Sequence, residues 1–212
     1  MKRGSLIISL FLVSILFISG CGPQMSYTGE ASYTVEAYNL NNGDIMVDIH
    51  VDGFKLKETI INGETYYKPF ISGATYSLEV NYPNLPHIIL PLMIGNYEYQ
   101  GEIISSSCEQ LSLDGDVGCS LGSMMRCDQQ GNFLDPSDSS CEFGPVYAED
   151  NFFPEESFYL NTPFIQGDAR GFIIDVNPLR YNPVQRTLEF CSYLSLRLTP
   201  VGSAIINPFE MR

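Results

Sequence analysis

The sequence predicts an all-β protein, an antiparallel β-sandwich-like domain that carries a Cys-rich loop insertion. Turn-forming dipeptides recur roughly every ten residues, as short antiparallel strands joined by tight turns require, at Asn42-Gly43, Asp52-Gly53, Asn62-Gly63 and Ser72-Gly73. Outside the apolar N-terminal segment, no window longer than about ten residues shows the apolar stripe of an amphipathic helix. Both observations favour strands throughout the folded part of the chain.

The clearest predicted strand covers residues 45–51, where Ile45, Val47, Ile49 and Val51 alternate with more polar neighbours. A period of two is typical of a strand with one buried side and one side facing solvent. Further strand-like runs follow at residues 54–61, 64–71, 75–82 and 87–94.

From residue 105 to about residue 154 the composition changes to Ser, Gly, Asp and Cys with little periodicity. A structureless stretch of this length is unusual inside a compact domain, so we predict an insertion at residues 105–150. The β domain is then expected to consist of residues 33–104 and 151–212, because strand-like sequence returns at Phe158.

Two apolar, β-branched runs within residues 170–199 flank the steps Asn177-Pro178 and Asn182-Pro183. Proline has no backbone N–H and a fixed φ, so neither step fits inside a paired central strand. In the second run one face carries Leu188, Phe190, Leu194, Leu196 and Leu198, and the other carries Glu189, Tyr193, Ser195 and Arg197. We therefore predict a β-hairpin with a long, proline-stiffened connection.

The N-terminus has the features of a bacterial lipoprotein signal peptide at residues 1–20. Lys2 and Arg3 precede an apolar core at residues 6–18, and the segment Ile18-Ser19-Gly20-Cys21 resembles a lipobox. We expect cleavage before Cys21, lipidation of that residue, and a tether at residues 21–32. An ordinary signal peptide with a cysteine nearby is the alternative.

The chain is strongly acidic, with a formal net charge of −14. It has too little positive charge to neutralise phosphates, so we expect no nucleic-acid partner. The same charge is repelled by anionic lipid surfaces, so membrane contact is expected through the lipid anchor alone. These features predict an exported, membrane-anchored lipoprotein, periplasmic or at the cell surface.

Four cysteines, Cys108, Cys119, Cys127 and Cys141, cluster in the expected insertion. Disulfides are favoured in an exported chain, and the paired short spacings of a zinc site are missing. We predict two bridges among these four residues, with their connectivity open. Cys191 is expected to be a structural or unpaired thiol.

Other candidate sites have simpler interpretations. Asp48, His50 and Asp52 share one strand face, where polar side chains commonly meet solvent, and His87 follows Pro86 in an apolar run as a packing residue. Five acids in the insertion lack the spacing of a calcium loop: Asp114, Asp116, Asp128, Asp135 and Asp138. We expect no metal site, no cofactor and no catalytic residue.

Three pieces of the chain carry a family resemblance. They are residues 53–72 (GFKLKETIINGETYYKPFIS), residues 82–93 (YPNLPHIILPLM) and the segment that holds Pro178, Tyr181, Asn182 and Pro183. In this order they resemble the N-terminal propeptide domain of gingipain-type cysteine peptidases, although Tyr82 stands where that family has a small residue. The similarity spans about residues 54–199, with the Cys-rich insertion as an interruption.

The resemblance implies a β-sandwich-like pro-domain that assists the folding of a peptidase and covers its cleft. The family's His-Gly-Glu loop and nucleophilic cysteine belong to the peptidase domain, and His-Gly-Glu does not occur in this sequence. The expected partner is therefore a cysteine peptidase domain, in cis or in trans. The alternative is a surface lipoprotein whose β-sandwich binds protein, glycan or cell-wall material through loops held on a rigid scaffold.

Overall fold

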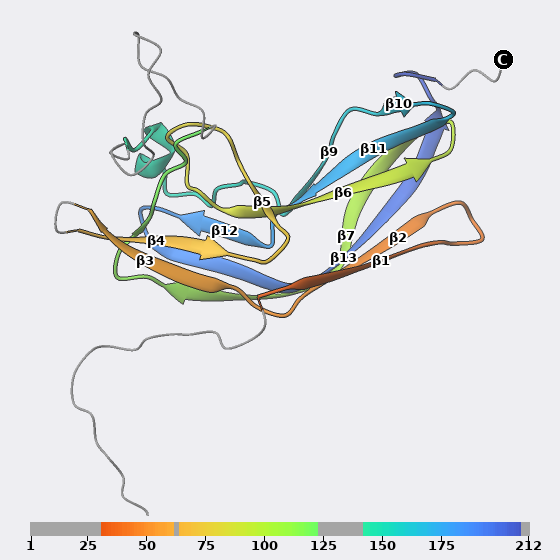
Figure 1. Cartoon of the computed structure of the whole chain (residues 1–212). Helices are drawn as coiled ribbons and strands as arrows, with labels where there is room; N and C mark the ends of the chain where they lie inside the picture. The colour runs from red at the N-terminus through yellow and green to blue at the C-terminus, as the bar shows by residue number, and fades with distance from the viewer. Residues whose placement is uncertain (1–30, 62–63, 123–141, 209–212) are drawn as a thin grey trace, which may run out of the picture.

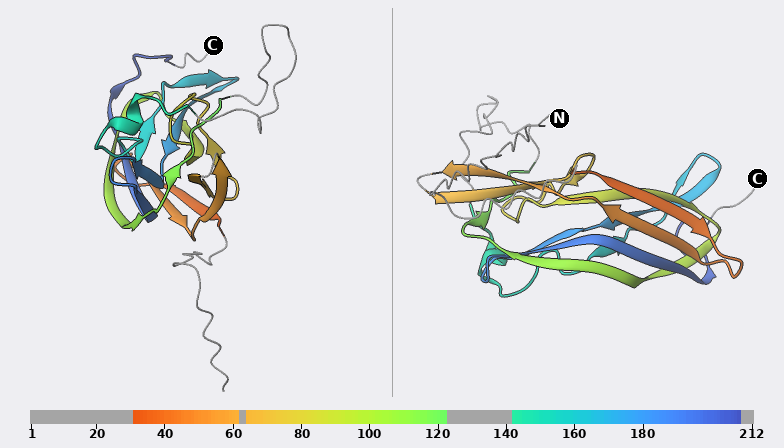
Figure 2. Two further views of the ribbon diagram at one scale, coloured as in Figure 1. Left: turned by 90° about the vertical axis from the view of Figure 1, so that its left-hand side faces the viewer. Right: turned by 90° about the horizontal axis from the view of Figure 1, so that it is seen from below.

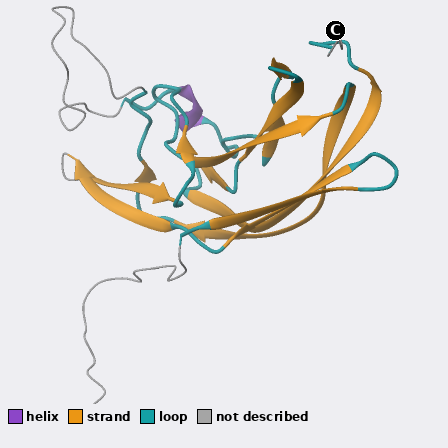
Figure 3. Ribbon diagram, turned by 45° about the vertical axis from the view of Figure 1, so that its right-hand side comes forward, coloured by secondary structure: helices purple, strands orange, loops and turns teal. Residues whose placement is uncertain are grey.

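A computed structural model describes residues 31–61, 64–122 and 142–208, and confirms the all-β fold class (Figure 1). Within these ranges the helical structure is a short 3-10 turn, η2 (Pro145–Ala148). It lies at the opposite end of the molecule from the C-terminus (Figure 3). None of the helical structure in the described ranges has the length or the apolar character to cross a membrane.

The largest sheet is built around β13 (Thr187–Ser203), the longest strand. Along one side β13 pairs with β12 (Leu179–Asn182) and then with β2 (Ile45–Val51), which in turn pairs with β1 (Tyr33–Asn39). Along its other side β13 pairs antiparallel with β7 (Tyr97–Ser112) over the whole length of that strand. β13 is therefore the central strand of this layer.

The second sheet faces the first and is built around β11 (Ala169–Val176) and β6 (Pro86–Ile94). The short strands β10 (Phe164–Gln166) and β9 (Phe158–Leu160) pair with β11, and β5 (Thr75–Tyr76) pairs with β6. The resulting molecule is elongated along its strands (Figure 2).

A third, small sheet closes one end. β3 (Lys55–Ile61) and β4 (Glu64–Phe70) form an antiparallel hairpin, and β8 (Asp116–Val117) joins β4 in parallel. Gly115 must be glycine here, because a Cβ atom would lie 2.3 Å from the Thr65 carbonyl oxygen. This sheet places the acidic segment around Asp116 against the hairpin.

The core lies between the layers and is apolar, as burial of the alternating strand faces requires. Phe54 packs on Phe190 with ring centroids 4.9 Å apart, and Tyr99 packs on Phe172 at 5.9 Å. The predicted inner face of β13 is buried, namely Leu188, Phe190, Leu194, Leu196 and Leu198.

Several predicted strands are confirmed. β2 begins and ends at the residues that alternation predicts, and β3, β4 and β6 match their predicted runs to within a residue or two. The predicted strand at 75–82 is wrong beyond Tyr76, because Asn81 donates its N–H to Ser120 and diverts the chain from the sheet. Gly43 and Gly73 have positive φ, as tight turns require.

The hairpin predicted within residues 170–199 is wrong in its pairing. β11 belongs to the second sheet and β13 to the first, so the chain crosses between layers at Asn177-Pro178. The true hairpin is β12–β13, turned at Pro183 to Arg186. Both prolines lie outside the strands, as their missing N–H groups require.

The insertion starts later than predicted. Residues 105–112 continue β7 and pair with β13, so they belong to the β domain. These residues are Ser-rich and mostly exposed, so their sequence lacks the alternation that would have predicted a strand. β7 nevertheless pairs with β13 along one side. The signal peptide, most of the tether and residues 123–141 lie outside the described residues, so their assignments stay predictions.

Candidate functional site: the hairpin corner and the disulfide

We call residues 177–186, between β11 and β13, the hairpin corner. Tyr181 at its centre is fully buried, and its hydroxyl donates to Asp116 Oδ1 at 2.9 Å. Its backbone exchanges hydrogen bonds of 2.7 and 2.8 Å with Phe153. Burial, followed by the bond to Asp116, raises the pKa of Tyr181, so the phenol remains a donor at neutral pH.

Asn182 and Pro183 shape the turn itself. Asn182 accepts a hydrogen bond from the Gln185 N–H at 3.0 Å and donates to Asp150 at 2.9 Å. Such side-chain to backbone bonds explain why Asn favours turns. The Pro183 carbonyl accepts from Arg186, which adopts a left-handed φ of 48°. Both motif residues therefore have a structural part in this corner.

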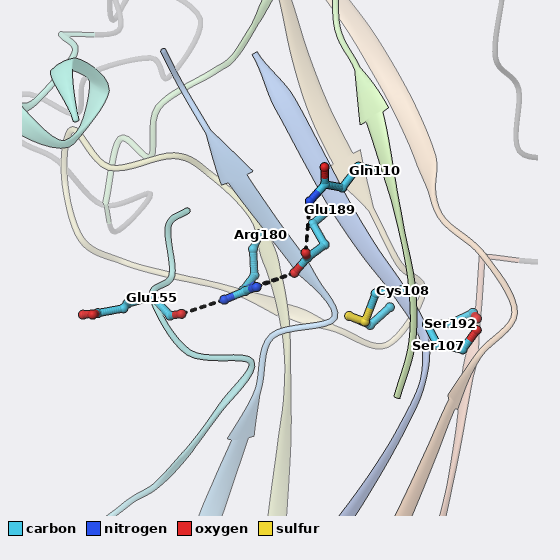
Figure 4. Close-up of a disulfide and its surroundings, with 8 residues drawn as sticks. Ser107, Cys108, Gln110, Glu155, Arg180, Glu189 and Ser192 are labelled. Carbon is cyan, nitrogen blue, oxygen red and sulfur yellow. Dashed lines mark hydrogen bonds and ion pairs between the residues drawn. A yellow bond between two sulfur atoms is a disulfide. The ribbon is translucent and has the colours of Figure 1, made fainter. Parts of the chain in front are cut away.

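Two arginines of the corner form ion pairs. Arg180 donates from Nε and Nη2 to Glu189 Oε1 at 2.7 and 2.5 Å, and from Nη1 to the Glu155 carbonyl at 2.6 Å (Figure 4). Arg186 contacts Asp116 at 3.2 Å. These cations hold the corner to neighbouring segments.

Pro178 connects the corner to a disulfide. Its carbonyl accepts a 2.8 Å hydrogen bond from Cys191, and Cys191 is bonded to Cys108 of β7 (Figure 4). Cys191 is therefore structural but is not a free thiol, and Cys108 forms a disulfide, as predicted, but across the sheet and not within the insertion. Cys108 and Cys191 are opposite one another in the β7–β13 ladder, which brings their side chains together.

The remaining cysteines divide by position. Cys119 is disulfide-bonded and buried beside β8. Cys127, Cys141 and the proposed lipidation residue Cys21 lie outside the described residues. The sequence could not reveal the Cys108–Cys191 pair, because β7 and its register with β13 were not recognisable from spacing.

The candidate metal ligands are engaged with other groups. Asp48 accepts hydroxyl hydrogen bonds from Tyr193 and Ser195 at 3.1 and 2.6 Å, and the His50 ring packs on Tyr193. Within the described ranges, no three His, Cys, Asp or Glu side chains are grouped as metal ligands. Asp128, Asp135 and Asp138 lie outside those ranges.

His87 has a polar partner that its apolar neighbours did not indicate. Its Nδ1 lies 2.6 Å from Asp175 Oδ1, across the β6–β11 ladder. The interpretation as a simple packing residue is therefore wrong.

The arrangement around the hairpin corner is one of fixed hydrogen bonds and ion pairs, which suits a rigid binding scaffold.

Several known proteins are similar to this chain in sequence. Residues 131–204 match the family model Propeptide_C25. Gingipain R1 of Porphyromonas gingivalis is 28% identical over 167 residues, which is 76% of this chain and 16% of that relative. Gingipain R2 of Porphyromonas gingivalis is 36% identical over 69 residues, which is 32% of this chain and 9% of that relative. The chain thus spans a small part of the length of these curated relatives.

Solved structures share the fold. A chain from the complex of Porphyromonas gingivalis RgpB pro- and mature domains superposes with a TM-score of 0.70 and 24% identity, covering 82% of this chain and 90% of that one. A structure from work on the zymogenic latency of Porphyromonas gingivalis gingipain K gives a TM-score of 0.65 and 16% identity, covering 80% and 93%. In sequence over residues 131–204, and in fold over most of its length, this chain is therefore similar to the non-catalytic propeptide region of gingipains.

Proposed function

We propose that this chain is an exported, lipid-anchored domain that binds a gingipain-type cysteine peptidase domain and occludes its cleft or assists its folding. The observation that carries the proposal is the match of residues 131–204 to a propeptide family, which includes the whole hairpin corner. The shared β-sandwich fold supports it.

The proposed mechanism is steric. The hydrogen bonds and ion pairs of the hairpin corner make a rigid scaffold, and loops or edge strands on such a scaffold can lie along a partner's cleft. β7 pairs with β13 along one side, so its other edge is suited to such a contact. No chemistry is required of this chain.

A direct test uses the peptidases of the same genome. The coding sequence beyond the Arg212 codon, and the neighbouring genes, should encode a domain with a His-Gly-Glu loop and a nucleophilic cysteine. Purified protein from Cys21 onward should then inhibit one such domain stoichiometrically in a peptide-hydrolysis assay, or raise its refolding yield. If it affects none of these domains, the proposal is wrong, and the alternative of a surface β-sandwich for protein, glycan or cell-wall ligands is favoured.

Membrane anchoring through Cys21 is a separate part of the proposal. It is supported by the basic start at Lys2 and Arg3, the apolar segment and the lipobox-like Ile18 to Cys21. The protein should fractionate with membranes, at the cell surface or facing the periplasm, while Cys21→Ala should be soluble. Ser26→Ala, a control in the tether, should fractionate like the wild type. Membrane fractionation of Cys21→Ala would contradict the anchor.

A further inference from the structure

Three aromatic rings meet at the end of the molecule that carries β4 and η2. Phe143 lies between Tyr66 of β4 and Tyr147 of η2, with ring centroids 5.7 Å and 4.2 Å away. These spacings are typical of favourable aromatic packing. Phe143 nevertheless keeps 41% of its surface exposed. We call Tyr66, Phe143 and Tyr147 the aromatic platform.

Hydrogen bonds from two of its hydroxyl groups hold the aromatic platform in place. Tyr147 donates its hydroxyl to the Val117 carbonyl at 2.8 Å, and Tyr66 donates to Glu64 at 2.7 Å. Burial raises the pKa of Tyr147, and the hydrogen bond to Glu64 raises that of Tyr66, so both phenols stay protonated donors. Since these rings are already ordered, they lose little conformational entropy when a partner covers them.

A second apolar pair lies at the same end. Leu78 is 68% exposed and Val80 is 43% exposed, on a loop whose Asn81 bonds to Ser120 and Gly144, both at 2.9 Å. Gly144 follows Phe143 directly, so this loop and the platform are joined by their backbones. Exposed apolar groups gathered in one region of a soluble domain mark an interaction surface.

Carboxylates surround this apolar centre. Glu142 and Glu79 are exposed beside Phe143 and between Leu78 and Val80, and Glu64 contacts Tyr66. Two cations lie near the region: Lys68, 4.6 Å from the Tyr76 ring centroid, and Arg186, which pairs with Asp116 at 3.2 Å. Glu64, Glu79 and Glu142 therefore make the rim beside the rings mainly acidic.

An aromatic centre with a charged rim has the anatomy of a protein–protein interface, in which a few central aromatic residues dominate affinity. The negative rim is complementary to a partner with Lys and Arg around an apolar hollow. A second copy of this acidic chain would be repelled by the same rim.

We propose that the aromatic platform, with Leu78, Val80 and their acidic rim, is the docking surface for the cysteine peptidase domain. The partner's matching face is an apolar hollow bordered by Lys and Arg side chains. This inference rests on the proposed function and adds to it the surface through which the two domains meet.

The test uses the mature full-length protein and the gingipain-type peptidase domain that the wild type binds. Phe143→Ala should weaken binding at least tenfold by calorimetry, since truncation of a central aromatic residue commonly has an effect of this size. Leu78→Asp should weaken it similarly, and this side chain is too exposed for its loss to unfold the domain. The matched control is Ile205→Ala, an 84% exposed side chain two residues after β13. The C-terminal end of β13 lies at the opposite end of the molecule from β3 and β4 (Figure 1).

The rim gives an independent measurement. The double change Glu79→Lys and Glu142→Lys should slow association several-fold at low salt and reduce its dependence on ionic strength, with folding checked by circular dichroism. Unchanged binding by folded Leu78→Asp, or losses equal to that of Ile205→Ala, would overturn the docking surface while leaving the proposed function intact. A wild type that binds no peptidase would overturn the function itself. Self-association that Phe143→Ala abolishes, with peptidase binding unchanged, would assign the platform to a second copy and contradict the proposal.

Discussion

Several tyrosines with raised pKa values form hydrogen bonds around the hairpin corner. Tyr181 bonds to Asp116, Tyr147 to the Val117 carbonyl, and Tyr67 to Asp114. The hydrogen bond to Asp114 raises the pKa of Tyr67 to about 12, and burial raises the pKa of Tyr147 and Tyr181. Each of these bonds requires the neutral phenol, because a phenolate has no proton to donate.

These shifts predict a loss of stability at alkaline pH. An unfolded tyrosine loses its proton near pH 10, while the folded groups still hold theirs. Between pH 10 and 12 the folded state therefore binds more protons than the unfolded state, and the free energy of unfolding falls as pH rises. Urea unfolding at pH 8, 10 and 11 should show this decline.

Tyr181→Phe provides the control. The variant should be less stable by about 1 kcal/mol at pH 8, because one buried hydrogen bond is lost. It should also show a smaller decline between pH 10 and 11, because one raised group no longer titrates. An identical pH dependence in both proteins would contradict a raised pKa for Tyr181.

Among the strands, β7 is joined to its neighbour β13 by a disulfide as well as by hydrogen bonds. It is an edge strand paired with β13, and the register shifts at three places, where Ile104 of β7 and Ser192 and Val201 of β13 have no partner in the ladder. Bulges are common in edge strands because they interrupt the open ladder. The Cys108–Cys191 disulfide fixes the register next to the first bulge.

Removal of this disulfide should be costly. The bond joins residues separated by 83 positions. For a loop of this size the chain-entropy model gives about 4.5 kcal/mol, and measured losses in small secreted domains are about 2–5 kcal/mol. The double variant Cys108→Ser/Cys191→Ser leaves neither partner of this bond as a lone thiol, and urea unfolding at pH 7 should show a loss in that range. A loss below about 1 kcal/mol would mean that β7 keeps its register by pairing and packing alone.

The sequence predicted strands where one face of a strand is buried, as in β2, because a period of two is then visible. It did not predict β7, whose exposed Ser105 to Ser107 and flanking glutamates have no such period. The disulfide was missed for the same reason, since cysteine spacing within a segment does not contain the register between distant strands. His87 was misassigned because its partner Asp175 is 88 residues away in the sequence and comes close only through the pairing of β6 with β11.

The hairpin corner was also predicted only in part from local sequence. Pro178 and Pro183 correctly indicated that these positions lie outside the strands. Local sequence, however, does not specify which sheet the following strand joins. The aromatic platform was not predicted at all, because Tyr66, Phe143 and Tyr147 are far apart in sequence and meet through the β4–β8 pair and η2.

At the scale of the whole molecule, negative charge dominates. The full chain has a formal net charge of −14, and five Arg–carboxylate ion pairs lie among the described residues, several of them exposed. Exposed pairs contribute little to stability, whereas like charges repel throughout the folded state. Screening should therefore favour folding.

Added salt should raise stability at pH 7. Between 10 and 300 mM NaCl the thermal unfolding midpoint should rise by a few degrees, because the screening length falls from about 30 Å to below about 8 Å. The double variant Glu79→Gln and Glu142→Gln, at exposed positions, should show a smaller increase. A midpoint that falls with salt would mean that the ion pairs outweigh the repulsion.

The central position of β13 has a mechanical consequence. The strand is flanked by β12 and β2 on one side and by β7 on the other, and it ends at Ser203, shortly before the last described residues. Tension applied at that end acts along the strand axis and loads both ladders in shear, so many hydrogen bonds must break together. The domain should thus withstand pulling from its C-terminal side far better than peeling of an edge strand.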